Sequence, residues 1–391
     1  MDAFHATFHA QEVLFGAGAV ARLGELCARD GYRRVMLCTT AHSRARGYVA
    51  PIEAALGERL LVTYEYVLPH VPELQVAEAA ALAAEHQVDA IIGLGGGSSI
   101  GTAKAVSRAW EARRRKSPAQ AQAQHAHVPS PIDQPLVPVI AIPTTYAGSE
   151  MTPVYGITYS ANGPARKVTA TDPQAVPRLT IYDPRLTLDL PPHMTAGTGI
   201  NAVAHCIEAL YSITRNPLST AAALAGLRAI ARTLPRCYAA GDDLEARAEM
   251  LVGAFLAGTA LASVAMGLHH SLCHVLGGTT GAAHGDANSV MLPHVMRFNL
   301  EATAPQIAPA AEAMGLAAAG LRPDVAAALV AHKVTAWVEQ MRLPRRLREI
   351  GVREEQLPEL SALAFASRTV QNNPKSVDSA EQIEALLRAA W

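Results

Sequence analysis

The sequence lacks any long uninterrupted apolar run. Half of its 391 residues are apolar and 17% are charged, yet no stretch approaches the roughly 18 consecutive apolar residues that a membrane-spanning helix needs. The first residues, MDAFHATFHAQEVLFG, also lack the basic start and apolar run that are typical of a secretory signal peptide. We therefore expect a cytoplasmic protein that does not enter a membrane.

The chain also lacks an excess of charge of either sign. Lys and Arg number 33 against 34 for Asp and Glu, so bulk electrostatics would not draw the protein to nucleic acid or to an anionic membrane. Cysteine is scarce as well: the five cysteines are odd in number and show no C-x-x-C spacing. This pattern indicates buried, reduced thiols and not a disulfide framework.

What the first half of the chain does contain is an alternation of short apolar runs and helical patterns. The segment 76–87, VAEAAALAAEHQ, has helical period and composition, whereas the runs around it have the length and residue types of buried strands. Such alternation predicts βαβ units and a parallel sheet with helices on both faces. The predicted strands are 33–40, 59–67, 88–97 and 136–145.

The composition and periodicity of the sequence change after Pro191 and Pro192. From about residue 193 onward, Ala, Leu, Glu and Arg recur at helical spacing and no comparable strand follows. Since the chain is too long for one ordinary core, we predict an α/β domain over 1–187 and an all-helical domain over 188–391, with the active site in the cleft between them. The segment 111–135, four consecutive cations and then an Ala, Gln and Pro-rich run, is expected to be a solvated helix end and a loop.

A glycine-rich loop follows one of the predicted strands. The segment 91–105, IIGLGGGSSIGTAKA, places Gly95, Gly96, Gly97 and Ser98 between a buried strand and the start of a helix. Glycines allow a close approach of the backbone, and a helix N-terminus offers free N–H groups, so this arrangement favours a bound pyrophosphate. A tight turn without a ligand is the alternative for this loop taken alone.

Two further strand ends carry small hydroxyl groups. In AIPTTYAGSEMT the hydroxyls of Thr144, Thr145 and Ser149 are candidates for binding phosphate or ribose, although turn and cap roles are the alternative. After the first βα strand, Thr39 and Thr40 stand where an acidic residue would repel a 2′-phosphate. We therefore expect NADH or NADPH as the cofactor.

Histidines gather in GLHHSLCHVLGGTTGAAHG, residues 267–285, which holds four of the 15 in the chain. Residues four apart on a helix share a face, so His270 points with His274, and Asn201 points with His205. With His284, three segments of the helical domain are expected to converge on one pocket. The histidines alone do not decide between a metal site and a substrate site.

The ordered motifs GGGS, IPTT, GSE, GINAVAHCIEALY, HHSLCHVLGG and HGDANSVMLPHVMRFN resemble those of the iron-containing alcohol dehydrogenases. This resemblance implies an N-terminal dinucleotide-binding α/β domain and a C-terminal helical domain, the dehydroquinate synthase-like fold. Within the family, TTYAGSEMTPVYGIT and GINAVAH look most like the maleylacetate reductases. The resemblance also implies a homodimer.

The resemblance implies a metal site, but this sequence differs from it at one ligand position. In metal-bearing members an Asp and three His hold the ion; the His positions match His205, His270 and His284, but the Asp position is Asn201, and His274 matches a residue beside the substrate. Gly101 also replaces an Asp of the glycine loop in many members. Three imidazoles can hold zinc, yet the only anionic ligand is gone. We therefore expect an enzyme that does not require a metal.

The activity implied by the resemblance is the NAD(P)H-dependent reduction of the maleylacetate double bond to 3-oxoadipate, in the degradation of aromatic compounds. We expect His270, His274 and His284 to bind a carboxylate or the enolate and to supply the proton, with His205 and Asn201 supporting them. Lys167 is expected to pair with the dicarboxylate substrate, unless it is an ordinary surface lysine.

Other functions remain open at this stage. The principal alternative is a metal-dependent (Fe or Zn) alcohol or lactaldehyde-type dehydrogenase on the same fold, and a non-catalytic NAD(P)-binding protein is a further one. His269 points about 100° away from His270 around the helix and is expected to lie outside the site. The remaining histidines of note are expected to be surface or packing residues: His5, His9, His42, His125, His127 and His294.

Overall fold

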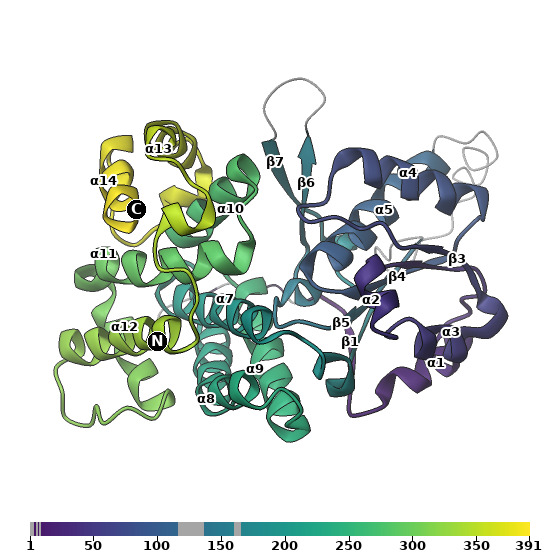
Figure 1. Ribbon diagram of the computed structural model, residues 1–391, viewed down its shortest axis with the longest axis horizontal. Coiled ribbons are helices and arrows are strands. Elements are labelled where there is room, and N and C mark those ends of the chain that lie inside the picture. The colour runs from purple at the N-terminus through teal and green to yellow at the C-terminus, as the bar shows by residue number, and fades with distance from the viewer. Residues whose placement is uncertain (1–3, 5–6, 8, 116–136, 160–165) are drawn as a thin grey trace. The chain divides into compact units, whose positions relative to one another are not determined.

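The computed structural model describes residues 4, 7, 9–115, 137–159 and 166–391 (Figure 1). From residue 9 onward the chain divides into two compact units: an α/β unit of 9–144 and 149–187, and a helical unit of 188–391 together with the short segment 145–148. Predictions made for His5, His125, His127 and the loop from 116 to 135 lie outside the described residues.

The α/β unit is built on a parallel sheet. In the described part of the chain this sheet has six strands in the order β1-β8-β5-β4-β2-β3, and every neighbouring pair is parallel. The four predicted strands are confirmed as β2 to β5, each shorter than expected, whereas β1 and β8 were not predicted. The bounds are β1 Glu12–Phe15, β2 Val35–Cys38, β3 Leu60–Tyr64, β4 Ala90–Gly95, β5 Val139–Pro143 and β8 Leu179–Tyr182.

Successive residues of each strand point to opposite faces of the sheet, and both faces are buried. In β2, Leu37 packs into a core formed with α1 and α3, whereas Met36 and Cys38 pack into a second core formed with α4 and α5. The two pairs of helices therefore cover opposite faces, as Figure 1 shows. The helices are α1 Leu23–Arg29, α2 Ala41–Ala45, α3 Ala50–Leu56, α4 Glu73–Glu85 and α5 Gly97–Arg115.

An antiparallel hairpin of β6 Val154–Tyr159 and β7 Arg166–Thr171 departs from the predicted, purely parallel sheet. Neither strand was predicted from the sequence, because β6 contains a glycine and β7, RKVTAT, is polar. The hairpin pairs Thr158 with Lys167.

The helical unit contains no strand in residues 188–391, all of which the structure describes. Proline in the first turn begins α7, α8 and α12, and the side chain of Asn216 accepts hydrogen bonds from the first turn of α8. The helices are α7 Pro192–Tyr211, α8 Pro217–Ala239, α9 Leu244–Ala262, α10 Leu268–Thr280, α11 His284–Ala313, α12 Pro323–Gln340, α13 Leu357–Phe365 and α14 Ala380–Ala390.

Two predictions from composition concern the whole chain. The five cysteines are all buried and free, which confirms the expectation of reduced thiols. Among the described helices, none is long and apolar enough to cross a membrane. The cytoplasmic location and the homodimer stay predictions.

Candidate active site

The histidines predicted to converge do come together within the helical unit. The ring of His270 lies 4.7 Å from that of His205, 6.2 Å from that of His274 and 6.2 Å from that of His284, measured between ring centroids. The rings of His274 and His284 stack at 5.7 Å. Helices α7, α10 and α11 thus contribute to one cluster, although their residues are as many as 79 positions apart in the sequence.

Glycine contacts allow the helices that carry these rings to approach closely. A Cβ on Gly285 would lie 3.0 Å from the backbone carbon of Gly197, so α11 can start against α7 only if this position has no side chain. Gly148 adopts φ +73°, and a Cβ there would lie 3.2 Å from Gly258 and 3.5 Å from Nδ1 of His205. These glycines bring α7, α9, the start of α11 and the segment 145–148 together around His205.

The residue that sequence reasoning missed is Glu208. Its carboxylate accepts hydrogen bonds from the backbone N–H groups of Gly267 (3.1 Å) and His270 (3.2 Å) and from the His270 ring at Nδ1. Glu208 therefore caps the N-terminus of α10, where the helix dipole favours an anion. The signal was available, since Asn201, His205 and Glu208 are spaced i, i+4 and i+7 on one face of α7.

The electrostatics of Glu208 follow from these contacts. Burial acts to raise the pKa of its carboxyl group, but the charge and hydrogen bond of His270, with further help from His269 and Gly267, hold the pKa below its ordinary value. Because an ionised carboxylate only accepts hydrogen bonds, Nδ1 of His270 must be the donor in their contact. The Nε2 atom of His270 is then the one available to a ligand.

Three buried polar atoms in the cluster have no hydrogen-bond partner among the described residues: Oδ1 of Asn201, Nδ1 of His205 and Nε2 of His270. The other side of the Asn201 amide is fixed, because its Nδ2 donates to the carbonyl of Ala147 at 3.3 Å. Buried polar groups are nearly always paired in folded proteins. A polar ligand could form hydrogen bonds with these unpaired donors and acceptors.

Burial changes the protonation of the innermost rings. It lowers the pKa of His205 well below its ordinary value, and the neighbouring His270, His269 and His274 lower it further. Burial and His270 likewise lower the pKa of His269 to about 4. His205 is therefore neutral at physiological pH and cannot serve as a cation for a carboxylate.

His269 lies beside the cluster but serves the packing. Its Nε2 is 2.8 Å from Oδ1 of Asn288, and Nδ2 of Asn288 donates to the carbonyl of His284 at 2.7 Å. This chain of contacts ties α10 to the first turn of α11. The exclusion of His269 from the site stays a prediction, and its contact through Asn288 helps to position His284.

The donor set does not fit a metal ion in this arrangement. The rings of His205 and His270 are stacked and only 19° from parallel, so their in-plane lone pairs run side by side instead of meeting at one point. Among the described residues, no three His, Cys, Asp or Glu side chains are grouped so as to hold a metal ion. Asn201 offers at most a neutral carbonyl oxygen.

In the α/β unit the predicted glycine loop follows β4 and opens α5. Gly95 has φ +138°, and a Cβ there would lie 2.6 Å from Oγ of Ser99; a Cβ on Gly93 would lie 2.9 Å from Cα of Ile100. Glycine at both positions therefore lets α5 start directly against the strand. Gly96, Gly97 and Ser98 are partly exposed at the N-terminus of this helix, where N–H groups are free for an anion.

The loop lies at the switch point of the sheet. The chain leaves β2 toward β3 on one side and leaves β4 toward β5 on the other. Ligands of open parallel sheets bind outside the carboxyl ends of strands at such a point. The topology thus places the glycine loop and the end of β2 where a dinucleotide is expected.

Residues predicted at the end of β2 have structural contacts of their own. Thr39 is fully buried and donates to the carbonyl of Leu94 at 3.0 Å, which links β2 to β4. The Thr40 hydroxyl accepts from the N–H of Ser43 and caps α2. The hydroxyls of both threonines therefore have partners within the fold, and their contacts with the nucleotide stay a prediction.

A buried lysine, also missed from the sequence, shapes the neighbouring loop. Nζ of Lys104 on α5 donates to the carbonyls of Ser149 (2.6 Å), Thr152 (2.7 Å) and Val154 (3.1 Å). Burial lowers the pKa of Lys104 to about 7, although the charge of Glu150 opposes this. The sequence did not indicate that Lys104 is buried, because a single lysine in a helix normally lies at the surface.

The segment after β5 is divided between the two units. Thr144 donates its N–H to the carbonyl of Gly95 at 3.0 Å and belongs with the glycine loop, whereas Thr145 belongs to the helical unit. Ser149 returns to the α/β unit. Tyr146 is fully buried, and its hydroxyl accepts a hydrogen bond from Arg247 at 3.0 Å.

Lys167 lies on β7 in the α/β unit and is not an ordinary surface lysine. Its stem packs over Gly156 of the paired strand, where a Cβ would lie 2.6 Å from Cε of Lys167. Burial lowers the pKa of its ammonium group, and no described residue forms a hydrogen bond or an ion pair with it. The place of Lys167 relative to the histidines stays a prediction.

A dinucleotide-type α/β unit joined to a helical unit with clustered histidines defines a class of nucleotide-dependent oxidoreductases. Two family models match the chain: "Iron-containing alcohol dehydrogenase" over residues 10–184 and "Fe-containing alcohol dehydrogenase family, C-terminal" over residues 195–391. The chain therefore belongs to the iron-containing alcohol dehydrogenase family, which confirms the predicted family and fold.

Within the family, the chain is similar to individual enzymes of known name. The maleylacetate reductase of Pseudomonas knackmussii is 35% identical over 98% of this chain and 96% of its own length. The crystal structure of maleylacetate reductase from Agrobacterium tumefaciens is 31% identical, with a TM-score of 0.80 and coverage of 100% and 99% of the two chains. That of a 1,3-propanediol oxidoreductase is 30% identical, with a TM-score of 0.89 and complete coverage of both.

Proposed function

We propose that this chain reduces the carbon–carbon double bond of maleylacetate to 3-oxoadipate with NADH or NADPH, and that it does so without a metal ion. The observation that carries the proposal is the neutral amide of Asn201 beside the stacked rings of His205 and His270. Relatives named maleylacetate reductase, which are 34–35% identical over nearly the whole chain, support the choice of substrate.

The chemistry suits hydrogen-bond donors. When bound, the reduced nicotinamide supplies a hydride to the alkene carbon of maleylacetate that lies β to the ketone. The electron pair of the double bond moves to the ketone oxygen as an enolate, and a proton is added to the neighbouring carbon. An enolate is a weaker base than the alkoxide of alcohol oxidation, so preorganised donors in a buried site can stabilise it without a Lewis acid.

The histidine cluster supplies these donors. Since Glu208 accepts the Nδ1 proton of His270, a second proton on Nε2 makes this ring a cationic donor whose charge the carboxylate balances. We assign His270 to the enolate oxygen or a substrate carboxylate, and the stacked pair of His274 and His284 to proton delivery. His205 contributes a neutral hydrogen bond, together with Asn201.

A second anchor is proposed on the α/β unit. The half-buried ammonium group of Lys167 has no carboxylate partner among the described residues, and its low-dielectric surroundings would strengthen a contact with an anion. We propose that Lys167 pairs with one carboxylate of the dicarboxylate substrate. Its position over Gly156 restricts the side chain and lowers the entropy lost on binding.

For the cofactor, we propose that Gly95, Gly96, Gly97 and Ser98 hold the pyrophosphate, with Thr144, Thr145 and Ser149 nearby. Arg44 and Arg46 follow Thr39 and Thr40 in the sequence and could bind a 2′-phosphate. Arg44 is already paired with Glu53 (2.9 Å) and Glu65 (2.5 Å). A comparison of kcat/KM for NADH and NADPH tests whether Arg44 is available to a 2′-phosphate; we expect NADPH to be used no better than NADH.

The deciding experiment follows NADH oxidation with maleylacetate, with and without a chelator, on protein whose metal content has been measured. We expect full activity in metal-free protein. Loss of activity on chelation and its recovery with Fe²⁺ or Zn²⁺ would refute metal independence, and absence of turnover with maleylacetate would refute the substrate.

One observation favours the alternative, a metal-dependent alcohol or lactaldehyde-type dehydrogenase. Metal-ligating histidines usually donate their second ring N–H to a carboxylate, as His270 does to Glu208. The same chelation experiment with short alcohols and aldehydes as substrates distinguishes the two functions, because only the alternative predicts alcohol oxidation that depends on the ion.

A further inference from the structure

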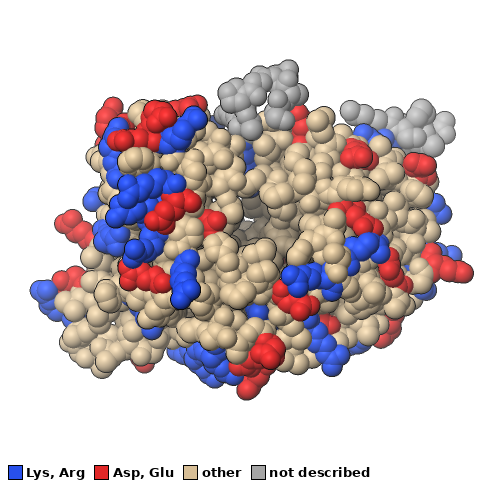
Figure 2. Space-filling model, in the orientation of Figure 1, with Lys and Arg blue, Asp and Glu red and all other residues tan. Residues whose placement is uncertain are grey.

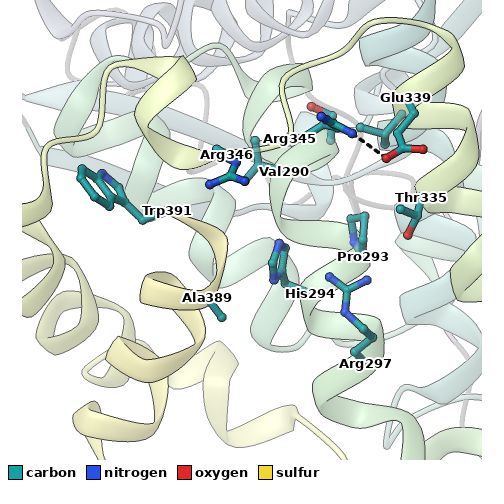
Figure 3. Close-up of a pocket in the computed structure, with 12 residues that line it drawn as sticks. Val290, Pro293, His294, Arg297, Thr335, Glu339, Arg345, Arg346, Ala389 and Trp391 are labelled. Carbon is teal, nitrogen blue, oxygen red and sulfur yellow. Dashed lines mark hydrogen bonds and ion pairs between the residues drawn. The ribbon is translucent and has the colours of Figure 1, made fainter.

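A polar cavity lies in the helical unit, on a part of α11 remote from the histidine cluster. Its volume is about 320 Å³, and α11, α12, the segment after α12 and the end of the chain line it (Figure 3). His284 of the cluster opens α11, and His294 of this cavity lies ten residues further along, about 15 Å along the helix axis. The cavity is therefore a separate feature of the helical unit.

Positive charge dominates the lining. Arg297, Arg345 and Arg346 face the cavity together with one carboxylate, Glu339, which is already paired with Arg345 at 2.5 Å (Figure 3). Among the described residues, no carboxylate lies within ion-pair distance of Arg297 or Arg346. Figure 2 shows Lys and Arg side chains gathered over the region of α11 and α14, with acidic side chains among them.

His294, expected from the sequence to be a surface or packing residue, lies among these groups. It lies three residues from Arg297 on the same face of α11, and Figure 3 shows the two side chains next to each other. Burial and the charge of Arg297 lower the pKa of His294 to about 4, and burial also lowers the pKa of Arg297. His294 is therefore neutral at physiological pH, and the positive charge of Arg297 has no carboxylate partner in the described part of the chain.

Apart from the hydroxyl groups of Ser289 and Thr335, the rest of the lining is apolar and suited to the body of a small molecule. Pro293 and Val338 are buried and form part of the wall. Ligand sites of proteins typically have volumes of roughly 300–1,000 Å³, apolar walls and a few converging polar groups. Arginine in particular holds carboxylate and phosphate groups by two parallel hydrogen bonds.

We propose that this cavity binds a small organic anion, whose carboxylate or phosphate group is held by Arg297 and Arg346 and whose apolar part packs on Pro293 and Val338. This site is distinct from the substrate and nucleotide residues discussed above, and the proposal does not depend on the activity proposed for them. Its occupant would stabilise the end of α14 against α11, since Ala389 and Trp391 also line the cavity.

The test uses the full chain and two probes, inorganic phosphate and benzoate, titrated calorimetrically at constant ionic strength. Saturating NAD⁺ is present so that the glycine loop does not compete for phosphate. In Arg297→Gln and Arg346→Gln we expect the affinity for at least one probe to fall about tenfold or more, as for the loss of a charged hydrogen bond. The matched control is Arg342→Gln, an exposed arginine outside the cavity lining.

These substitutions remove no ion pair that the described residues form, so the variants should fold, and circular dichroism checks this. Tighter binding of benzoate would identify an organic carboxylate as the ligand class, and tighter binding of phosphate a phosphate ester. The proposal is overturned if neither probe binds the wild-type protein. It is equally overturned if Arg297→Gln and Arg346→Gln bind both probes as Arg342→Gln does.

Discussion

Replacing Glu208 by Gln should damage both the fold and the histidine cluster. The carboxylate accepts three hydrogen bonds, one oxygen serving Gly267 and the other serving the backbone and ring of His270. A Gln side chain of the same shape has only one oxygen. Its NH₂ group must therefore face either the N–H of Gly267 or the N–H groups of His270.

The magnitude follows from what is lost. Hydrogen bonds to a charged acceptor contribute about 1.5–3 kcal/mol each, and a buried donor left unpaired costs about 1–3 kcal/mol. Allowing for partial relaxation, the free energy of unfolding of Glu208→Gln should fall by about 3 kcal/mol at neutral pH. The favourable interaction of the anion with the N-terminus of α10 is lost as well.

The effect should depend on pH in a defined direction. Because the pKa of Glu208 is lowered in the folded state, its charge stabilises the protein above the unfolded-state pKa of about 4.3. This stabilisation is lost as the pH falls through the lowered folded-state pKa. The stability difference between the wild type and Glu208→Gln should hence be constant from neutral pH down to about pH 5 and shrink in more acidic solution.

Urea unfolding followed by tryptophan fluorescence measures the stability, and NADH oxidation with maleylacetate measures kcat. If Glu208 sets the tautomer of His270, kcat should drop by about 100-fold or more in Glu208→Gln. Glu301→Gln, an exposed position on α11, serves as the control. Unchanged stability and kcat in Glu208→Gln would refute the assigned hydrogen bonds and the role of His270 together.

Three further outcomes are expected. Lys167→Gln should raise KM for maleylacetate about tenfold with little change in KM for NADH, and an equal effect on both would contradict carboxylate binding. Asn201→Asp should bind Zn²⁺ or Fe²⁺ more tightly, as measured by equilibrium dialysis, without gaining maleylacetate reduction; a large metal-dependent gain would contradict the metal-free mechanism. Gly93→Ala should lower the unfolding free energy by about 1–3 kcal/mol, because its Cβ would lie 2.9 Å from the backbone of Ile100. Gly101→Ala meets only the flexible end of Val71 at 3.2 Å and should be milder, so equal losses in urea unfolding would argue against that packing.

Periodicity was sufficient to predict the central strands, because β2, β4 and β5 are buried on both faces and their sequences are continuous apolar runs. It failed for β1 and for the hairpin, whose residues are partly exposed and whose pairing depends on partners distant in the sequence. Strand identity at an edge is decided by tertiary contacts more than by local composition.

The same distinction holds for the candidate site. Helical spacing was enough to place Asn201 with His205, and His270 with His274, on shared helix faces. It could not reveal that Glu208 caps a helix 60 residues further along the chain, because a cap formed by a distant residue has no local pattern. The contact between the Thr39 hydroxyl and the carbonyl of Leu94 was not predicted, for the same reason.

The division of the segment around residue 145 has a consequence for experiments that cut or exchange parts of this chain. Ala147 supplies the acceptor that fixes the Asn201 amide, and the hydroxyl of Tyr146 is a partner of the buried Arg247. A fragment that starts at residue 188 would leave both contacts behind. Chimeras between family members should therefore transfer residues 145–148 along with the C-terminal half, because these four residues are inherited in sequence with one unit but fold as part of the other.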